Sequence, residues 1–541
     1  MIDPAVVAER RRRLFAPELW LDRTVDSFLA RHIAATPHKT AVAGVRSDGV
    51  ATRRIDYAEL GAMVDRAAGA LRAMGVGHGD VVSMQLPNWW QFAVVALACA
   101  RLGAACNPIV HILREREVRW IVEFSGSKVL IVPSTFRKFD YAAMARSVQA
   151  AVPTLRRVIV AGEDGPDGFE QALLVGPETV PYDAAAPAQR PDDLLVLMFT
   201  SGTTGEPKGV MHTSNTVLGH LLRTARALGL DADDVFFAAT PLGHMTGYGH
   251  FVLLPLILGA TTVLQDHHEP HRGLRIMDEE GVTFSAGATP FLADLVDCAR
   301  ADGIRPRRLR RFWCAGAPIP PALVRRAIDE LGLGICSIWG MTEVTAGTMT
   351  EPEHPQRAAE SDGRALPGIE VKVLGDSGRE QPRGQTGRLL VRGASLFCGY
   401  LKRPEAAQVD ADGWFDTGDL AHMDGEGYIR IAGRTKELLI RGGENVPVIE
   451  VENVLLGHPA IAEVAIVGMP DERLGERGCA FIVPREGRSI DLPAVQRYLD
   501  GEKLAKAFWP ERVECVDALP KTASGKVQRF LLKQRAAGLS A

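Results

Sequence analysis

The alternation of strand-like apolar runs with segments of helical periodicity restricts the fold of this chain more than any other feature. Between residues 56 and 160, an amphipathic stretch at 57–74 stops at Gly75 and is followed by an apolar run at 81–86. Strands that alternate with helices predict a parallel sheet covered by helices. A second alternating series over residues 194–311 predicts a second sheet of the same kind.

The pattern changes after Gly363. Short strand-like segments at 370–374, 387–392 and 428–431 are separated by turns rich in Gly, Pro and Asp. Such segments favour a small antiparallel barrel or sheet. A helical segment followed by a strand begins again near residue 449, which indicates a further domain.

The fold class expected from these patterns is α/β with more than one domain, because 541 residues are too many for one hydrophobic core. Residues 1–433 are expected to form a large N-terminal region of two doubly wound sheets plus a small β-barrel. Residues 434–541 are expected to form a smaller α+β C-terminal domain.

Composition and charge exclude several classes of function. The formal net charge of −4 gives no basic surface for nucleic acid or for a membrane. The N-terminus carries basic residues without the apolar stretch of a signal peptide. The longest apolar stretch, at 92–106, contains Arg101 and is too short to span a bilayer, so it predicts a buried helix. We expect a cytoplasmic protein with no nucleic-acid partner and no integral membrane association.

Cysteines and histidines do not form a recognisable metal or disulfide pattern. The histidine-rich stretch at 267–271 lacks HExxH spacing, and Pro270 prevents a regular helix through it, so a loop between a strand and a helix is expected. No CxxC pair is present, which favours reduced thiols. The scattered cysteines are Cys99, Cys106, Cys298, Cys314, Cys336, Cys398, Cys479 and Cys515.

The strongest local signal is a loop of small hydroxyl residues and glycines that follows an apolar strand at 194–199. Gly202 and Gly205 let the backbone approach a ligand, and Lys208 adds a mobile positive charge, a combination that suits a polyphosphate. It is not a Walker A loop, because Gly209 rather than Ser or Thr follows the lysine. The residues expected to hold phosphate are Thr200, Ser201, Gly202, Thr203, Thr204 and Lys208.

This loop and the motifs that follow it in order resemble those of the adenylate-forming superfamily, which includes acyl-CoA synthetases, luciferase-like enzymes and peptide-synthetase adenylation domains. The resemblance covers nearly the whole chain. The later motifs are Pro-Leu-Gly-His-Met-Thr-Gly at 241–247, Trp-Gly-Met-Thr-Glu at 339–343, Trp-Phe-Asp-Thr-Gly-Asp at 414–419, Gly-Arg-Thr-Lys-Glu at 433–437 and Pro-Lys-Thr-Ala-Ser-Gly-Lys at 520–526.

A hydroxyl beside a carboxylate suits one phosphate contact plus one Mg²⁺ ligand, and the resemblance gives these roles to Thr342 and Glu343. It implies that Trp339 stacks on adenine, while Asp419 and Arg434 grip the ribose and phosphate. The rest of the implied ATP/AMP site is Gly316, Ala317, Pro318, Gly340 and Met341. Where relatives carry Asp, Asn or Gln two residues before the stacking aromatic, this chain has Ser337.

The C-terminal motifs imply a moving lysine. Lys526 matches the family lysine that touches the substrate carboxylate and the α-phosphate, where a cation stabilises developing charge. Lys436 matches a hinge position that makes residues 434–541 mobile against the AMP-binding domain at 1–433. Rotation there brings in Gly442 and Gly443, which leave room for the pantetheine arm of CoA.

The acyl pocket is expected to be apolar and larger than acetate requires. His244 falls where the family places a residue that gates acyl entry, although a lone histidine fits a packed core equally well. Met245 is expected to line the pocket beside it. Ala286, Gly287, Ala288 and Gly316 are expected walls, and Gly340 replaces a bulky Trp of acetate-restricted relatives. The chain is most similar to short/medium-chain and alicyclic acid ligases of the cyclohexanecarboxylate–CoA ligase type.

The function expected from the sequence is an AMP-forming acid–thiol ligase. It uses ATP, Mg²⁺ and coenzyme A on a medium-chain, branched or alicyclic carboxylate. The alternative is an enzyme that loads an acid or amino acid onto a carrier protein. A luciferase-like oxygenase stays open, whereas intact Lys526, Glu343 and Asp419 argue against a non-catalytic ATP-binding regulator. The sequence leaves a homodimer open.

Overall fold

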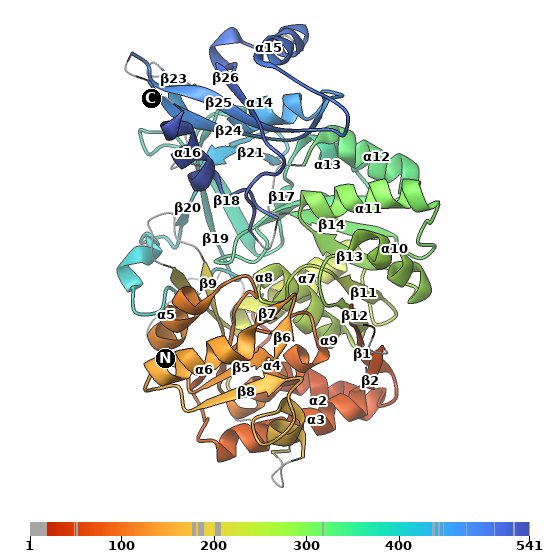
Figure 1. Ribbon diagram of the computed structural model, residues 1–541. Coiled ribbons are helices and arrows are strands. Elements are labelled where there is room, and N and C mark those ends of the chain that lie inside the picture. The colour runs from red at the N-terminus through yellow and green to blue at the C-terminus, as the bar shows by residue number, and fades with distance from the viewer. Residues whose placement is uncertain are drawn as a thin grey trace.

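The computed structural model shows the expected α/β architecture, with a large N-terminal region and a smaller C-terminal domain (Figure 1). It describes residues 19–47, 49, 52–175, 180–181, 189–200, 207–315, 319–434, 439–441, 444–446, 448–471, 473–502, 504–522 and 525–539.

The first sheet has six strands in the order β10-β9-β4-β3-β5-β8. They are β3 Val81–Met84, β4 Ala105–Pro108, β5 Val129–Pro133, β8 Arg157–Ala161, β9 Leu194–Thr200 and β10 Lys208–Thr213, and their helices are α3 Tyr57–Ala73, α4 Trp90–Leu102, α5 Glu115–Ser125 and α6 Tyr141–Ala151. β9 pairs in parallel with β4 through Val196 and Cys106. The strand that enters the predicted phosphate loop therefore belongs to this first sheet, whereas the sequence pattern had placed it in the second.

The second sheet has nine strands in the order β17-β16-β15-β14-β13-β11-β12-β1-β2. They are β1 Thr40–Val45, β2 Arg53–Asp56, β11 Val235–Ala238, β12 Thr261–Gln265, β13 Phe284–Gly287, β14 Arg311–Ala315, β15 Gly334–Trp339, β16 Thr348–Met349 and β17 Arg364–Ala365. β1 and β2 come from the start of the chain. They belong to this sheet because β1 pairs in parallel with β12. The sequence pattern did not predict these two strands.

Helices cover both sheets and separate them (Figure 1). The apolar stretch around Arg101 is the buried helix α4, as predicted, and its guanidinium pairs with Asp26 at 2.6 Å and with Asp65. The other described helices of the N-terminal region are α2 Val25–Ala35, η2 Glu170–Leu174, α7 Ser214–Leu228, α8 Met245–Tyr248, η3 Gly249–Leu253, α9 Leu254–Leu258, α10 Pro270–Glu279, α11 Thr289–Asp302, α12 Pro321–Leu331, α13 Pro355–Glu360 and η4 Pro404–Ala407.

The region expected to be a small barrel is a four-stranded antiparallel sheet, β18-β19-β20-β21. Its strands are β18 Ile369–Leu374, β19 Gly387–Gly393, β20 Phe415–Met423 and β21 Ile429–Arg434. The C-terminal domain, blue in Figure 1, has strands β22 Leu439–Arg441, β23 Glu444–Val446, β24 Ile461–Asp471, β25 Gly475–Pro484 and β26 Arg512–Cys515, with helices α14 Val448–Leu455, α15 Leu492–Gly501 and α16 Arg529–Gly538.

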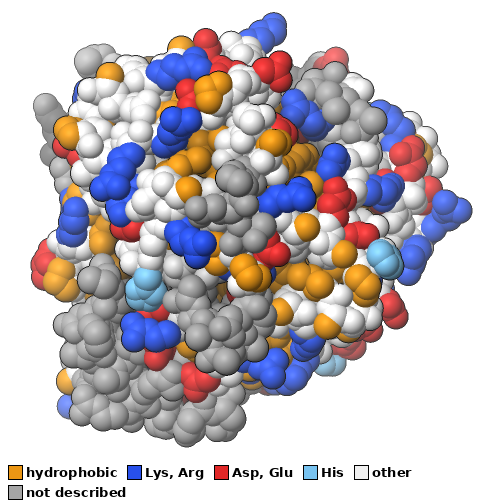
Figure 2. All heavy atoms as spheres, turned by 90° about the horizontal axis from the view of Figure 1, so that it is seen from below, with side chains coloured by type: hydrophobic (Ala, Val, Ile, Leu, Met, Phe, Trp, Pro, Cys, Tyr) orange, Lys and Arg blue, Asp and Glu red, His pale blue; other side chains and the backbone are white. Residues whose placement is uncertain are grey.

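The surface and the helices agree with the composition. Basic, acidic and hydrophobic side chains intermingle on the face seen from below in Figure 2. Across the described segments, no helix is both long and apolar enough to cross a membrane. All eight cysteines are free, so no disulfide joins them.

The histidines of the 267–271 stretch point to different carboxylates. His267 pairs with Asp266 at 3.1 Å, and His268 pairs with Asp294 at 2.7 Å. His271 pairs with Asp302 at 2.9 Å. Residues 267–269 form the predicted loop between β12 and α10, whereas Pro270 and His271 are already the first two residues of the helix. Within the described ranges, no group of three or more His, Cys, Asp or Glu side chains is arranged to hold a metal.

His220 is a buried histidine on α7. Neither ring nitrogen has a hydrogen-bond partner among the residues that the structure describes, and burial, with the charge of Arg223 adding to it, lowers the pKa of its imidazole to about 3. The unfolded imidazole titrates near its ordinary value of 6.5. Between these values the unfolded chain binds a proton that the folded chain does not, so stability falls as the pH falls through this window.

Replacing His220 by leucine is therefore expected to protect the chain against acid. Between about pH 7 and about pH 4.5, the variant should lose about 2 kcal/mol less free energy of unfolding than wild type. Thermal unfolding at both pH values measures the difference. His38→Leu is the control, because the His38 side chain is 88% exposed and its loss should change nothing. An equal acid-induced loss in wild type and His220→Leu would contradict the prediction.

Candidate functional site

The predicted phosphate loop is anchored by two paired strands. Thr200 ends β9 and Lys208 begins β10, and the two residues are antiparallel partners in register. The loop between them is therefore closed at its base, with the Lys208 side chain at its exit. The loop residues Ser201, Gly202, Thr203 and Thr204 lie outside the described residues, as do Gly316, Ala317, Pro318, Lys436, Gly442 and Gly443.

A segment from the third sheet region runs along β10 and brings Tyr400 into the site. Cys398 N donates to Met211 O at 2.8 Å, and Leu401 N donates to Gly209 O at 2.8 Å. Lys208 Nζ lies 4.7 Å from the centroid of the Tyr400 ring. Sequence reasoning missed Tyr400; the Gly399-Tyr400 dipeptide at the end of an apolar run was the available signal.

Glu343 supplies the carboxylate that contacts Tyr400. It lies in the turn after β15 and is buried, and its Oε1 accepts a hydrogen bond from the Tyr400 hydroxyl at 2.7 Å. Burial raises the pKa of Glu343, and the Tyr400 hydroxyl and Lys208 oppose that rise. The backbone is fixed as well, because Phe397 N donates to Glu343 O at 2.7 Å.

His212 supports Thr342, the other half of the predicted phosphate and metal pair. His212 lies on β10 and is completely buried, and its Nε2 donates to Thr342 O at 2.7 Å. Its Nδ1 faces Thr216 Oγ1 at 3.0 Å. His212 thus joins the strand that leaves the phosphate loop to the Thr342-Glu343 turn. It was not predicted, because nothing in the sequence indicates this pairing.

Trp339, Asp419 and Arg434 form one hydrogen-bonded chain. The Trp339 indole N–H donates to Asp419 Oδ2 at 2.8 Å, and Arg434 Nε donates to Asp419 Oδ1 at 2.8 Å. Asp419 and Arg434 are partners in register on β20 and β21. The structure therefore brings the predicted adenine and ribose residues together. Ser337, by contrast, donates to Ala358 O at 2.6 Å and is completely buried.

The turn in which Gly340 lies requires glycine, which the interpretation of this residue as part of the acyl pocket did not include. A Cβ at this position would lie 2.3 Å from Thr345 O, so the turn itself excludes a side chain. Thr345 has φ of +68°, a conformation that is strained for a β-branched residue. Glycine here therefore serves the turn that carries Met341, Thr342 and Glu343, whatever its effect on the depth of the acyl pocket.

The loop that carries Lys526 packs against the predicted acyl residues. A Cβ at Gly525 would lie 3.6 Å from Ala288 Cβ and 3.6 Å from Pro290 Cγ, next to Ala286 and Gly287 at the end of β13. His244 and Met245 stand at the start of α8. Burial of the imidazole lowers the pKa of His244 to about 4, and the positive charge of Lys526 contributes to this shift. His244 is therefore neutral near neutral pH.

A largely buried ion pair between Arg529 and Glu452 anchors the chain just after Lys526. Arg529 donates to both oxygens of Glu452, at 2.6 and 2.7 Å, and also to Ile466 O at 2.8 Å. Thr522 N donates to Lys526 O at 2.7 Å. Thr522 and Lys526 are thus joined on the C-terminal domain, while Gly525 lies beside Ala288 of the N-terminal region.

Comparison with known proteins agrees with this arrangement. The AMP-binding enzyme family model matches residues 29–401, and the AMP-binding enzyme C-terminal domain model matches residues 450–526. A medium-chain fatty-acid–CoA ligase of Escherichia coli (strain K12) is 34% identical over 533 residues, 97% of this chain and 93% of that protein. A salicyl-AMP ligase / salicyl-S-ArCP synthetase of Mycobacterium tuberculosis (strain ATCC 25618 / H37Rv) is 32% identical over 533 residues, 97% of this chain and 93% of that protein.

Solved structures show the same fold. The anthranilate CoA ligase AuaEII in complex with anthranoyl-AMP has a TM-score of 0.86 at 26% identity, covering 96% of this chain and 98% of that one. The chain therefore belongs to the AMP-binding enzyme family and is an AMP-forming ligase of the adenylate-forming superfamily.

Proposed function

We propose that the chain is an acyl-CoA synthetase that joins a carboxylic acid to coenzyme A in two steps. In the first step the carboxylate oxygen attacks the α-phosphorus of ATP, which forms an acyl-adenylate and releases pyrophosphate. In the second step the thiol of CoA attacks the activated carbonyl and releases AMP. Activation replaces a poor leaving group with AMP, and the enzyme supplies positioning and charge stabilisation.

The observation that carries the proposal is the meeting of Lys526 with the predicted acyl residues. The Gly525-Lys526 tip packs near Ala288, and the charge of Lys526 reaches His244. A cation at this place is suited to the charge that develops on the α-phosphate as the bond to pyrophosphate breaks. In the proposed site, Lys208 serves the outer phosphates and the Asp419–Arg434 pair serves the ribose.

Glu343 fits the protein side of a magnesium site. Mg²⁺ in nucleotide enzymes is usually held by one or two carboxylates together with substrate phosphates, and bound there it neutralises phosphate charge. Glu343 offers one buried carboxylate, with Thr342 beside it and Lys208 close by. That donor set suits a cation shared with ATP better than one held by the protein alone.

We further propose a division at the hinge near Lys436, with residues 1–433 binding AMP and residues 434–541 moving between the two steps. After adenylation, rotation of the C-terminal domain would remove Lys526 and bring Gly442 and Gly443 to the pantetheine arm. In this proposal, the position of Gly525 beside Ala288 supports assigning the observed arrangement to the adenylation step.

The acid is proposed to be a medium-chain, branched or alicyclic carboxylate larger than acetate. Ala286 at the end of β13 has a small side chain where the acyl group would lie, whereas the space beside Gly287 is occupied by Phe291. Each additional buried methylene favours binding by about 0.8 kcal/mol, so such a wall rewards a larger substrate. The medium-chain ligase among the relatives supports this choice.

Carboxylate-dependent exchange of pyrophosphate into ATP tests the proposal. We expect exchange with acids of medium size, and formation of AMP and a thioester when CoA is added. The assay should compare linear, alicyclic and aromatic acids, with acetate as the small control. Absence of exchange with every acid, from a folded protein that binds ATP, would refute the function.

Loading of an acid onto a carrier protein is the second candidate. The salicyl-AMP ligase / salicyl-S-ArCP synthetase among the relatives favours it. Both candidates predict the exchange reaction, because both make an acyl-adenylate. Addition of CoA separates them, since a carrier-loading enzyme would retain the adenylate when only CoA is offered.

A further inference from the structure

Tyr400 lies between the two charged groups of the proposed phosphate and metal site. Its hydroxyl donates to Glu343 Oε1 at 2.7 Å, while Lys208 Nζ stands over its ring at 4.7 Å from the centroid. The Tyr400 side chain is buried at 4% exposure. The charge of Lys208 opposes the rise in the pKa of Glu343, but these two described side chains do not form a direct ion pair.

The position of Tyr400 is fixed from two directions. Its backbone neighbours pair with β10, and Val210 and Tyr400 form an antiparallel bridge. Its ring packs edge-on against Phe397, with 4.8 Å between centroids. The phenol therefore has one orientation, in which the hydroxyl meets the carboxylate and the face meets the ammonium.

An ammonium and a buried carboxylate that contact the same phenol attract each other, because a protein interior screens charge poorly. In direct contact they would satisfy each other, and neither would be available to a ligand. The phenol offers each a different partner: a charge-assisted hydrogen bond for the carboxylate and a cation–π contact for the ammonium.

We propose that Tyr400 is a positioning residue that keeps Lys208 and Glu343 from pairing with each other. Lys208 then remains directed at the phosphates of ATP, and Glu343 remains available to the metal. This inference rests on the proposed function, which assigns those two ligands to the two residues.

The test is binding of metal-free ATP to the full chain, measured by calorimetry in the presence of a chelator. In Tyr400→Phe the carboxylate loses its donor and is expected to draw Lys208 into a direct pair, so the affinity for ATP should fall about tenfold. In the double variant Tyr400→Phe/Glu343→Gln the competitor is gone, so the affinity should equal that of Glu343→Gln alone. Unchanged affinity in Tyr400→Phe, or a loss that persists undiminished in the double variant, would overturn the proposal.

Tyr428→Phe is a matched control. Its hydroxyl donates to Glu351 Oε2 at 2.8 Å and Arg357 stands 4.6 Å from its ring centroid, which is the same chemistry away from the site. ATP affinity should be unchanged, and an equal loss there would assign the Tyr400 effect to general destabilisation. If Tyr400→Phe alone does not fold, the double variant still gives the comparison with Glu343→Gln. Failure of wild type to bind ATP would count against the proposed function itself.

Discussion

Replacing Lys526 by alanine is expected to lower the rate of acid-dependent ATP–pyrophosphate exchange about 10²–10³-fold, the usual effect of removing one group that stabilises developing charge. Thioester formation from acyl-adenylate supplied to the enzyme should survive, because the proposed second step takes place with Lys526 rotated away. Exchange of labelled pyrophosphate and release of AMP from the supplied adenylate measure the two steps separately.

Lys533→Ala is the control for this change. Lys533 is also a lysine of the C-terminal domain, but it pairs on the surface with Glu476 at 2.7 Å. In the Lys533→Ala variant, both reaction steps should therefore run at the wild-type rate. Loss of both steps in a folded Lys526→Ala protein would show that Lys526 serves each of them. Retention of full exchange would remove the lysine from the chemistry altogether.

The elements that the sequence predicted well are those whose signal is local. Helix α4 was predicted from a continuous apolar stretch, and α3 from its amphipathic period and the glycine that follows it. By contrast, β1 joins β12 across more than two hundred residues of sequence, and β9 crosses back to β4. Local periodicity identifies a strand but does not identify its neighbours, so the assignment of β9 to the second sheet was wrong.

The candidate site divides in the same way. Lys208, Glu343, Asp419 and Lys526 stand in motifs, and their residue types alone suggest phosphate chemistry. His212 and Tyr400 were missed because each acts through a partner from a distant segment, Thr342 O and Glu343 Oε1. Gly340 was interpreted through the acyl pocket alone, although the contact that excludes a Cβ comes from Thr345, five residues further along the same turn.

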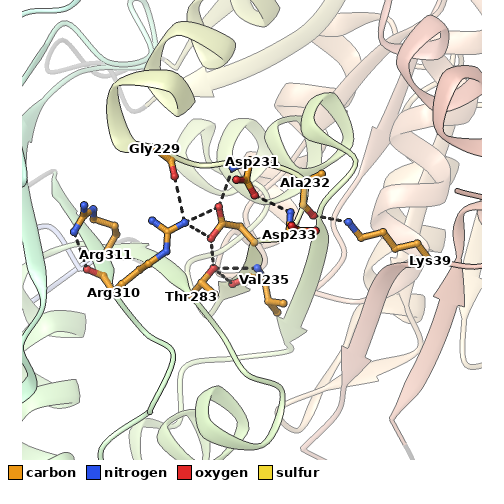
Figure 3. Close-up of polar contacts among 10 residues, drawn as sticks. Lys39, Gly229, Asp231, Ala232, Asp233, Val235, Thr283, Arg310 and Arg311 are labelled. Carbon is orange, nitrogen blue, oxygen red and sulfur yellow. Dashed lines mark hydrogen bonds and ion pairs between the residues drawn. The ribbon is translucent and has the colours of Figure 1, made fainter. Parts of the chain in front are cut away.

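The second large effect is expected at Asp234, which bonds to residues at the starts of two strands that neighbour its own in the second sheet. Figure 3 shows its partners Thr283, Arg310 and Asp231. Its side chain is 2% exposed, and both its oxygens accept from Arg310 Nη2, at 2.7 and 2.9 Å. Thr283 Oγ1 donates to it at 2.5 Å and Asp231 N at 2.9 Å. Asp234, Thr283 and Arg310 directly precede β11, β13 and β14, and Arg310 also reaches Gly229 O at the end of α7.

Asp234→Ala should lower the free energy of unfolding by about 3 kcal/mol, because it removes one partner of a largely buried ion pair and leaves Asp231 N without its acceptor. Thr283 would keep only its longer contact with Val235 O, at 3.3 Å. Arg310 is 41% exposed and can turn to water, which keeps the loss at the lower end for such pairs. Asp234→Asn keeps an acceptor for Thr283 and should cost less. Calorimetric unfolding gives the size of the loss, and hydrogen exchange of β11 and β13 gives its place.

Asp278→Ala is the matched comparison. Asp278 also accepts from an arginine side chain and a backbone N–H, both of Arg307, but the Arg307 side chain is 81% exposed. An exposed pair of this kind contributes little to stability, because water screens it. If the two alanine variants lost equal stability, burial of Asp234 would not explain its role, and the junction of the three strands would have to be held by the backbone ladder alone. A much larger loss at Asp234 would show that this junction, on which β13 and the acyl residues at its far end depend, is fixed by one carboxylate.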